Sequence, residues 1–261
     1  MIETRPYYSA KGLSAVHYDQ ITAMDPSVRG DVDIYARLSP PGGSVLELGA
    51  GTGRVAMALA ERGIHVLGIE IAAAMLQQAQ AKVARAPATV ARRVRFLQAD
   101  MTSLNLDETF DAVICPFFGL SHLPAGAAWK NVFGRIASLL KPGGYAAFHV
   151  PDAERLAAAP PPAPDRPVLR LPADDKGESL VIYIADRVSK PEIARFDQAV
   201  DYVIVDRRNQ ELRRVRERLT YYAADPIPYG VAAGLIPGTP IIPMGETGYI
   251  QVFHKPQDRI G

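Results

Sequence analysis

The hydrophobic positions follow two alternating periods along the first 150 residues. Short apolar runs, typical of buried parallel strands, alternate with segments in which apolar residues recur at helical spacing. Strands are expected at residues 44–48, 65–70, 94–99, 110–115 and 144–150, with helices at 53–62, 73–85 and 129–140. Alternating βαβ units predict an α/β fold, a doubly wound parallel sheet covered by helices on both faces.

The pattern changes after Pro151. Five prolines between residues 159 and 167 predict a stiff, extended connector. Three strand-like runs follow at hairpin spacing and predict an appended antiparallel β-meander, and a last run is expected to join the main sheet; these runs are residues 179–188, 192–205, 212–223 and 249–254. The chain is thus divided into an N-terminal helical cap (1–40), a core (41–158), a β insertion (159–225) and a C-terminal segment completing the core sheet (226–261).

Composition and charge give little information about the function of the protein, but they bear on its partners and its compartment. The formal net charge of +1 offers no electrostatic reason for a nucleic-acid or membrane partner. A single cysteine excludes an internal disulfide framework and fits a reducing compartment. No apolar run approaches the roughly 20 residues that span a bilayer. We therefore expect a soluble, cytoplasmic protein, and the spacing of the histidines predicts no metal site.

The most informative segment is residues 45–53, Val-Leu-Glu-Leu-Gly-Ala-Gly-Thr-Gly. A buried strand here leads into glycines at every second position, and glycine permits positive φ and close approach of a ligand. Strand, glycine loop and helix together open a nucleotide-binding α/β fold. A dinucleotide fingerprint requires Gly-x-Gly-x-x-Gly, and Arg54 occupies the place of the third glycine, so an NAD-dependent enzyme is the least supported reading.

The run Glu47-x-Gly49-x-Gly51-x-Gly53 resembles motif I of the class I S-adenosylmethionine (SAM) methyltransferases. The resemblance implies a Rossmann-like, seven-stranded sheet that binds SAM and releases S-adenosylhomocysteine. SAM carries an amino group and a sulfonium but no phosphate, and an acidic residue at position 47 suits such a cationic ligand. In the family this acid acts near the methionine end of the cofactor.

Two further carboxylates follow strands two and three. Glu70 stands where doubly wound folds bind the ribose hydroxyls, and the resemblance places Asp100 at the adenine amine, although a turn or helix-cap aspartate is the alternative. Ile71 is expected to flank the adenine and Met75 to close that face. The full set expected to bind the cofactor is Glu47, Gly49, Ala50, Gly51, Thr52, Gly53, Arg54, Glu70, Ile71, Met75, Asp100, Met101, Cys115, Pro116 and Phe117.

The loop after the fourth strand bears on the acceptor. In nucleic-acid amino methyltransferases it carries Asp or Asn, Pro, Pro and an aromatic residue, whereas here Cys115 and Phe117 replace the first and third of these. A cysteine is a weak acceptor, which argues against methylation of a base amine. His122 lies further along this loop and is expected near the transferred methyl group. A histidine can remove a proton from the acceptor near neutral pH; the alternative is a structural hydrogen bond.

Residues 117–123 and 139–144 resemble the small-molecule branch that contains sugar-amine N-methyltransferases and glycine N-methyltransferase-like enzymes. Tyr18-Asp19 matches an N-terminal Tyr-Asp segment of that branch, and the sugar-amine enzymes hold a histidine and a tyrosine at the acceptor. The resemblance implies His122 and Tyr18 as catalytic residues. The residues expected to line the acceptor pocket are Tyr7, Tyr8, Phe118 and His149. The proline-rich run departs from the tryptophan-containing segment of the sugar enzymes.

The sequence thus favours transfer of a methyl group to nitrogen or oxygen of a small molecule, with carbon still open. An RNA or protein methyltransferase is the first alternative, because arginines gather between residues 207 and 218; a solvated strand face explains them more simply. A non-catalytic SAM-binding protein is the second alternative. We expect a small-molecule acceptor, no nucleic acid, no membrane, and a homodimer formed through the meander.

Overall fold

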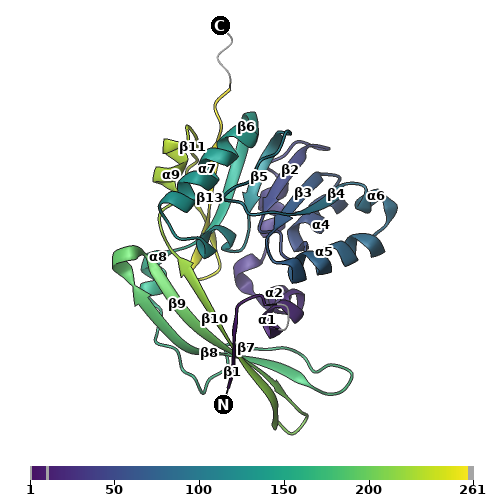
Figure 1. Cartoon of the computed structure of the whole chain (residues 1–261), viewed down its shortest axis with the longest axis vertical. Coiled ribbons are helices and arrows are strands. Elements are labelled where there is room, and N and C mark those ends of the chain that lie inside the picture. The colour runs from purple at the N-terminus through teal and green to yellow at the C-terminus, as the bar shows by residue number, and fades with distance from the viewer. Residues whose placement is uncertain (1, 10–11, 258–261) are drawn as a thin grey trace.

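The computed structural model describes residues 2–9 and 12–257. Two β-sheets dominate it: an α/β core and, beside it, a separate five-stranded sheet, with the short helices α1 (Leu13–Val16) and α2 (Tyr18–Met24) between them (Figure 1). None of the helices in the described part of the chain is long and apolar enough to cross a membrane.

The core sheet confirms the expected α/β class. Its strands run in the order β11-β13-β6-β5-β2-β3-β4, with β12 paired to β13, so it has eight strands where seven were expected. Strands β2 to β6 pair in parallel, and β13 joins β6 antiparallel, as expected for the last strand. The strands are β2 (Ser44–Leu48), β3 (His65–Glu70), β4 (Val94–Gln98), β5 (Phe110–Cys115), β6 (Leu140–Pro151), β11 (Ile236–Pro237), β12 (Ile242–Met244) and β13 (Gly248–His254).

Helices cover both faces of this sheet, because the alternating strand residues are apolar on both sides. Trp129 and Phe133 pack against one face, and Tyr35 and Leu59 against the other, all four fully buried. The helices of the core are α3 (Asp31–Ala36), α4 (Arg54–Glu61), α5 (Ala73–Arg85), α6 (Ala88–Ala91), α7 (Ala127–Leu139) and α9 (Ile227–Ala232).

The second sheet has the order β1-β10-β9-β8-β7. Its three long strands form the expected antiparallel meander, and two short strands extend it. One of these, β1, pairs in parallel with β10, so the N-terminal segment is not purely helical as expected but begins with an edge strand. The bounds are β1 (Glu3–Pro6), β7 (Leu169–Arg170), β8 (Ser179–Lys190), β9 (Arg195–Val205) and β10 (Glu211–Tyr222).

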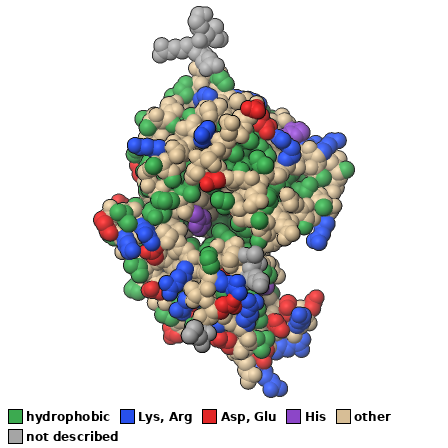
Figure 2. Space-filling model, viewed as in Figure 1, with side chains coloured by type: hydrophobic (Ala, Val, Ile, Leu, Met, Phe, Trp, Pro, Cys, Tyr) green, Lys and Arg blue, Asp and Glu red, His purple; other side chains and the backbone are tan. Residues whose placement is uncertain are grey.

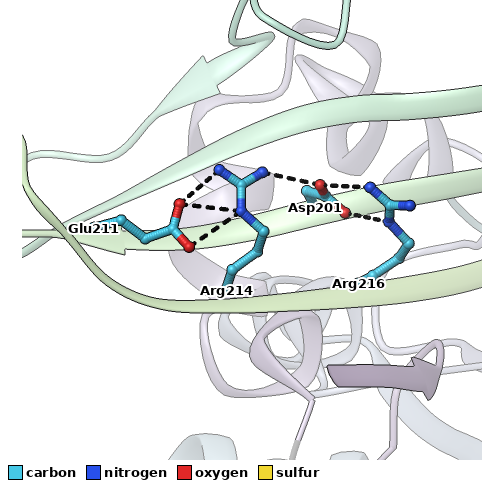
Figure 3. Close-up of polar contacts among 4 residues, drawn as sticks. All are labelled: Asp201, Glu211, Arg214 and Arg216. Atoms are coloured by element: carbon cyan, nitrogen blue, oxygen red, sulfur yellow. Dashed lines mark hydrogen bonds and ion pairs between the residues drawn. The ribbon is translucent and has the colours of Figure 1, made fainter. Parts of the chain in front are cut away.

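Ion pairs occupy the charged face of the meander (Figure 3). Asp201, whose side chain is 4% exposed, accepts from Arg216 Nε at 2.6 Å and from Arg214 Nη1 at 3.0 Å. Arg214 also donates to Glu211 at 2.7 Å. These arginines therefore neutralise carboxylates of their own sheet.

Side-chain hydrogen bonds tie the N-terminal helices to both sheets. Glu217 of β10 is fully buried and accepts from the backbone N–H of Ser14 at 3.0 Å. Asp19 accepts from Thr52 of the glycine loop at 2.6 Å and from Lys82 of α5. The proline-rich run, which follows α8 (Ala153–Ala158), has neither helix nor strand over residues 159–168, as expected for a connector.

Candidate active site

The glycine loop after β2 forms the floor of a cavity of about 500 Å³. Gly49, Gly51 and Gly53 all have positive φ, at 68°, 58° and 78°. The first two line the cavity. Gly53 has a packing role instead, since a Cβ there would lie 2.6 Å from the Phe96 ring. The loop thus offers bare backbone to a ligand and then turns into α4.

Glu70, at the end of β3, lines the same cavity. Its carboxylate accepts from the N–H of Gly51 at 2.9 Å and from the N–H of Ala72 at 2.7 Å, one bond on each oxygen. Each carboxylate oxygen accepts about two hydrogen bonds, so both retain capacity for ligand hydroxyls. The backbone therefore holds this acceptor in a fixed position, as ribose recognition requires.

The same cavity is also lined by Asp100, Met101, Ile71 and Met75. Asp100 Oδ1 accepts from the N–H and the hydroxyl of Thr102, both at 2.8 Å. Asp100 therefore does stabilise a turn, as the alternative from the sequence proposed, but it does so with Oδ1 alone. Its Oδ2 can still accept from a ligand. Ile71 is 64% exposed at the mouth, whereas Met75 is buried.

Glu47 lies beneath the loop rather than in the cavity lining. Its burial raises the pKa to about 8, against the opposing charge of Arg54, and its Oε2 has no hydrogen-bond partner among the described residues. Arg54 does not line the cavity either: it donates to Asp31 at 3.0 Å, and Asp31 is itself buried. Glu47 is therefore a buried acid with one oxygen that makes no hydrogen bond to the described residues.

The raised pKa of Glu47 predicts a specific pH dependence of stability. Between its ordinary pKa of 4.5 and about 8, the folded protein holds a proton that the unfolded chain has lost. The free energy of unfolding of the ligand-free protein should therefore fall as pH rises through this window, by on the order of a few kcal/mol. Melting temperatures measured from pH 5 to 9 test this. In Glu47→Gln the decline should largely disappear; an unchanged slope would contradict the assignment.

Four other residues expected at the cofactor do not reach the cavity. Thr52 is buried and bonded to Asp19, Gly53 packs on Phe96, and Ala50 is buried beside Gly68. Cys115 is fully buried, its pKa is raised to about 12 by burial, and its Sγ faces the backbone of Gly119. The next two residues, Pro116 and Phe117, do line the cavity, as expected.

The backbone of the turn after β5 is strained at two consecutive residues. Phe117 and Phe118 are consecutive residues with positive φ, 43° and 60°, which bulky side chains rarely adopt. The N–H of Phe118 donates to the carbonyl of His149 at 3.2 Å and holds the turn against β6. Phe117 consequently borders this cavity and also a second one, of about 750 Å³, which Phe118 lines as well.

The two cavities meet at His122. Five residues line both of them, namely Tyr7, Tyr8, Phe117, His122 and Leu219. Figure 2 shows this region as a hollow between the core and the five-stranded sheet, with hydrophobic side chains around it. The two cavities are therefore neighbours, with these five residues between or beside them.

His122 is open to both cavities and enclosed by aromatic rings. The ring centroids of Tyr7 and Tyr8 lie 6.5 Å and 5.9 Å from it. The surrounding protein lowers its pKa below the ordinary 6.5 by desolvation, and a hydrogen bond with the backbone of Thr220 partly offsets this. A neutral imidazole carries one N–H and one nitrogen that can accept a proton. The arrangement suits a proton acceptor that is neutral at pH 7.

The remaining predicted residues divide between the cavities. Tyr18 lines the first cavity only, while Tyr7 and Tyr8 line both. His149 corrects the expectation of an acceptor contact: it is fully buried behind Phe118, with ring centroids 4.3 Å apart, and lines neither cavity. Burial lowers its pKa to about 4, so it is a neutral packing residue.

The insertion was expected to lie over the acceptor pocket, but sequence reasoning did not identify which of its residues line the cavities. Leu219 and Thr220 of β10 line the first cavity, and Tyr202 of β9 donates to the hydroxyl of Tyr7 at 3.2 Å. Nothing in the local sequence marks these residues, because their position depends on docking of the meander. Gly119 also lines the cavity and lies in a loop that the sequence had singled out.

Comparison with known proteins agrees with this geometry. Residues 45–144 match the family model described as a methyltransferase domain. The similarity to a methyltransferase domain thus covers the α/β core of this chain. Its fold confirms the expected resemblance to the class I methyltransferases.

Individual relatives extend the comparison. The chain is 32% identical over 148 residues to the putative methyltransferase YqeM of Bacillus subtilis, covering 56% of this chain and 57% of that protein. The chain thus spans little more than half the length of this relative. The CcbJ methyltransferase of Streptomyces caelestis has a similar fold at 19% identity, with a TM-score of 0.74 and coverage of 97% and 99%. SAM-bound CalS10 from Micromonospora echinaspora, described as an amino pentose methyltransferase, gives a TM-score of 0.62 at 20% identity, with coverage of 95% and 94%.

Proposed function

We propose that the protein is a SAM-dependent methyltransferase acting on nitrogen or oxygen of a small-molecule acceptor. The observation that carries this is the meeting of two cavities at His122, one of them built on the glycine loop. The methyltransferase domain and the small-molecule enzymes among the structural neighbours support it. S-adenosylhomocysteine is the product left in the first cavity.

The residues of the first cavity fit SAM. Gly49 and Gly51 offer backbone without side chains, and Glu70 presents a fixed carboxylate to the ribose. Glu47, with an oxygen lacking a partner among the described residues, complements a cationic amino group above the loop. SAM supplies an activated methyl group on a sulfonium. The protein has only to hold the acceptor in line with that methyl group and exclude water.

His122 has a chemical role if the nucleophile carries a proton. Its free ring nitrogen accepts that proton from the acceptor N–H or O–H as the new bond to carbon forms. The rings of Tyr7 and Tyr8 lie beside the imidazole, and Phe117 lines both cavities with it. Tyr18, on the cofactor side, has its pKa raised by burial and so acts as a neutral positioning residue.

Asp100→Ala tests the orientation of the cofactor. Loss of Oδ2 leaves the adenine amine without its acceptor, so SAM affinity should fall by about 1–3 kcal/mol, roughly five- to 150-fold. Calorimetric titration with SAM measures it. Thr102→Val is the matched control: it removes the hydroxyl that donates to Asp100 Oδ1 but no group assigned to the cofactor. Unchanged affinity in Asp100→Ala would refute the adenine assignment.

Incubation with methyl-deuterated SAM and a metabolite extract of the source organism tests the proposal directly. A mass-shifted small molecule would establish the activity and identify the acceptor. Label found only in RNA or protein would replace the proposal by the first alternative. Measurable SAM binding without any labelled product would favour a non-catalytic protein.

The charged sheet face does not favour a nucleic-acid acceptor. Arg214 and Arg216 are paired with Asp201 and Glu211, so they are not free to contact phosphates. The proposal retains a cap (1–40), a SAM-binding core (41–158), an insertion over the acceptor (159–225) and a closing segment (226–261). It also retains a cytoplasmic location and a homodimer formed through the five-stranded sheet.

A further inference from the structure

The second cavity has an unusual wall. The connector between α8 and β7 lines it with Ala159, Ala163, Arg166, Val168 and the prolines Pro160, Pro161, Pro162 and Pro167. Proline has no backbone N–H, so this wall offers few hydrogen-bond donors. It is also stiff, which reduces the entropy lost when a ligand binds against it.

Another wall is formed by the five-stranded sheet, where the side-chain oxygen of Gln198 is already occupied. Gln198 accepts from Arg187 Nε at 3.1 Å and from the hydroxyl of Tyr221 at 3.3 Å. Ile184 and Leu219 lie on the same wall. This side therefore presents apolar surface and aromatic faces to the cavity.

The charges around the cavity cancel or lie at its mouth. Two of its lining residues are acidic and two basic: Asp25 and Glu246, Arg166 and Arg187. Asp25 Oδ1 accepts from the N–H and the hydroxyl of Ser27 at 2.8 and 2.6 Å, and Arg166 and Glu246 are exposed. The lining therefore has no excess of either charge to favour a charged acceptor, and its proline wall offers few donors to a many-hydroxylated one.

We propose that the acceptor is a neutral, elongated and largely hydrophobic molecule, and that the segment 159–168 determines this specificity. The inference rests on the proposed function: the nucleophilic end lies at His122, where the cavities meet, and the apolar body extends along the proline wall. A volume of about 750 Å³ suits a drug-sized molecule rather than a single amino acid or monosaccharide.

A homologous series of probes tests the inference. The protein saturated with S-adenosylhomocysteine is titrated with 4-n-alkylphenols of increasing chain length. The dissociation constant should fall about fourfold per added methylene, equivalent to about 0.8 kcal/mol, until the chain fills the cavity. The corresponding 4-alkylbenzoates should bind at least tenfold more weakly. A flat series, or benzoates binding as tightly as the phenols, would overturn the inference.

Two neighbouring alanines provide a matched pair of variants. Ala159→Phe narrows the cavity at its wall. In this variant the affinity for alkylphenols should stop rising at a shorter alkyl chain than in the wild type. Ala158→Phe places the same ring one residue earlier, on the exposed side of α8 outside the lining, and should leave the series unchanged. Identical behaviour of the two variants would show that segment 159–168 does not set the specificity.

The cofactor titration separates the two proposals. If S-adenosylhomocysteine binds and the alkylphenol series is flat, the inference fails while the proposed function stands. If S-adenosylhomocysteine does not bind but affinity still rises with chain length, the proposed function fails and the apolar acceptor cavity stands.

Discussion

His122→Ala is expected to lower turnover by about 10²–10⁴-fold and to leave SAM binding intact. The histidine is the group at the junction of the cavities whose free ring nitrogen can accept a proton, while Glu70 and Asp100 lie on the cofactor side. Single-turnover rates with the identified acceptor measure the first effect, and calorimetry the second. A loss below tenfold would reduce His122 to a positioning residue.

The pH profile separates a base from a merely structural residue. Because desolvation lowers the pKa of His122, the neutral form should persist below pH 6.5, and the wild-type rate should decline with acid only below that value. His122→Gln keeps a hydrogen-bonding side chain but cannot take up the proton, so it should lose this acidic limb together with the rate. His254→Ala, which removes a histidine of β13 that packs on Tyr145, is the matched control and should retain both.

Gly53→Ala is expected to lower the free energy of unfolding by about 2–5 kcal/mol. Two costs combine: the left-handed backbone at φ 78° disfavours any residue with a Cβ, by about 1–2 kcal/mol, and the new methyl group would lie 2.6 Å from Phe96 and 3.3 Å from Ala79. Overpacking of this kind costs about 1–3 kcal/mol. Chemical denaturation measures the change.

Gly63→Ala isolates the first of these costs. Gly63 has a similar φ of 89°, but nothing lies within 4 Å of a Cβ placed there. The free energy of unfolding of this variant should therefore fall by only about 1–2 kcal/mol. Equal losses for the two variants would show that the contact with Phe96 relaxes freely and that packing at the glycine loop is not tight.

The core could be predicted from sequence because its signals are local. The strand at Ser44–Leu48 and the helix at Ala73–Arg85 follow from periodicity alone and occur as expected. The positions of the glycine loop, Glu70 and Asp100 could also be predicted from the sequence, because the carboxyl ends of parallel strands lie at one edge of the sheet. Nine of the fifteen residues predicted at the cofactor line the first cavity, whereas the other six lie outside its lining.

The second sheet and the acceptor side depend on contacts between distant residues. Strand β1 reads Glu-Thr-Arg-Pro, which has no strand pattern, and it forms only by pairing with β10 some 200 residues later. His149 was misjudged for a related reason. Its place at the end of β6 was right, but the Phe118 turn packs over it and separates it from the cavity. Such screening depends on three-dimensional packing that no local pattern encodes.

The burial of Cys115 has a practical consequence. It is the only cysteine of the chain, it is fully buried, and burial keeps it in the thiol form at neutral pH. Alkylating dyes react with exposed thiolates, so the native fold presents them no target. A cysteine introduced at an exposed position, such as Val231 in the core or Leu212 in the five-stranded sheet, would therefore be the sole labelling site. A fluorescent dye there could report on either part of the protein without any change to the native thiol.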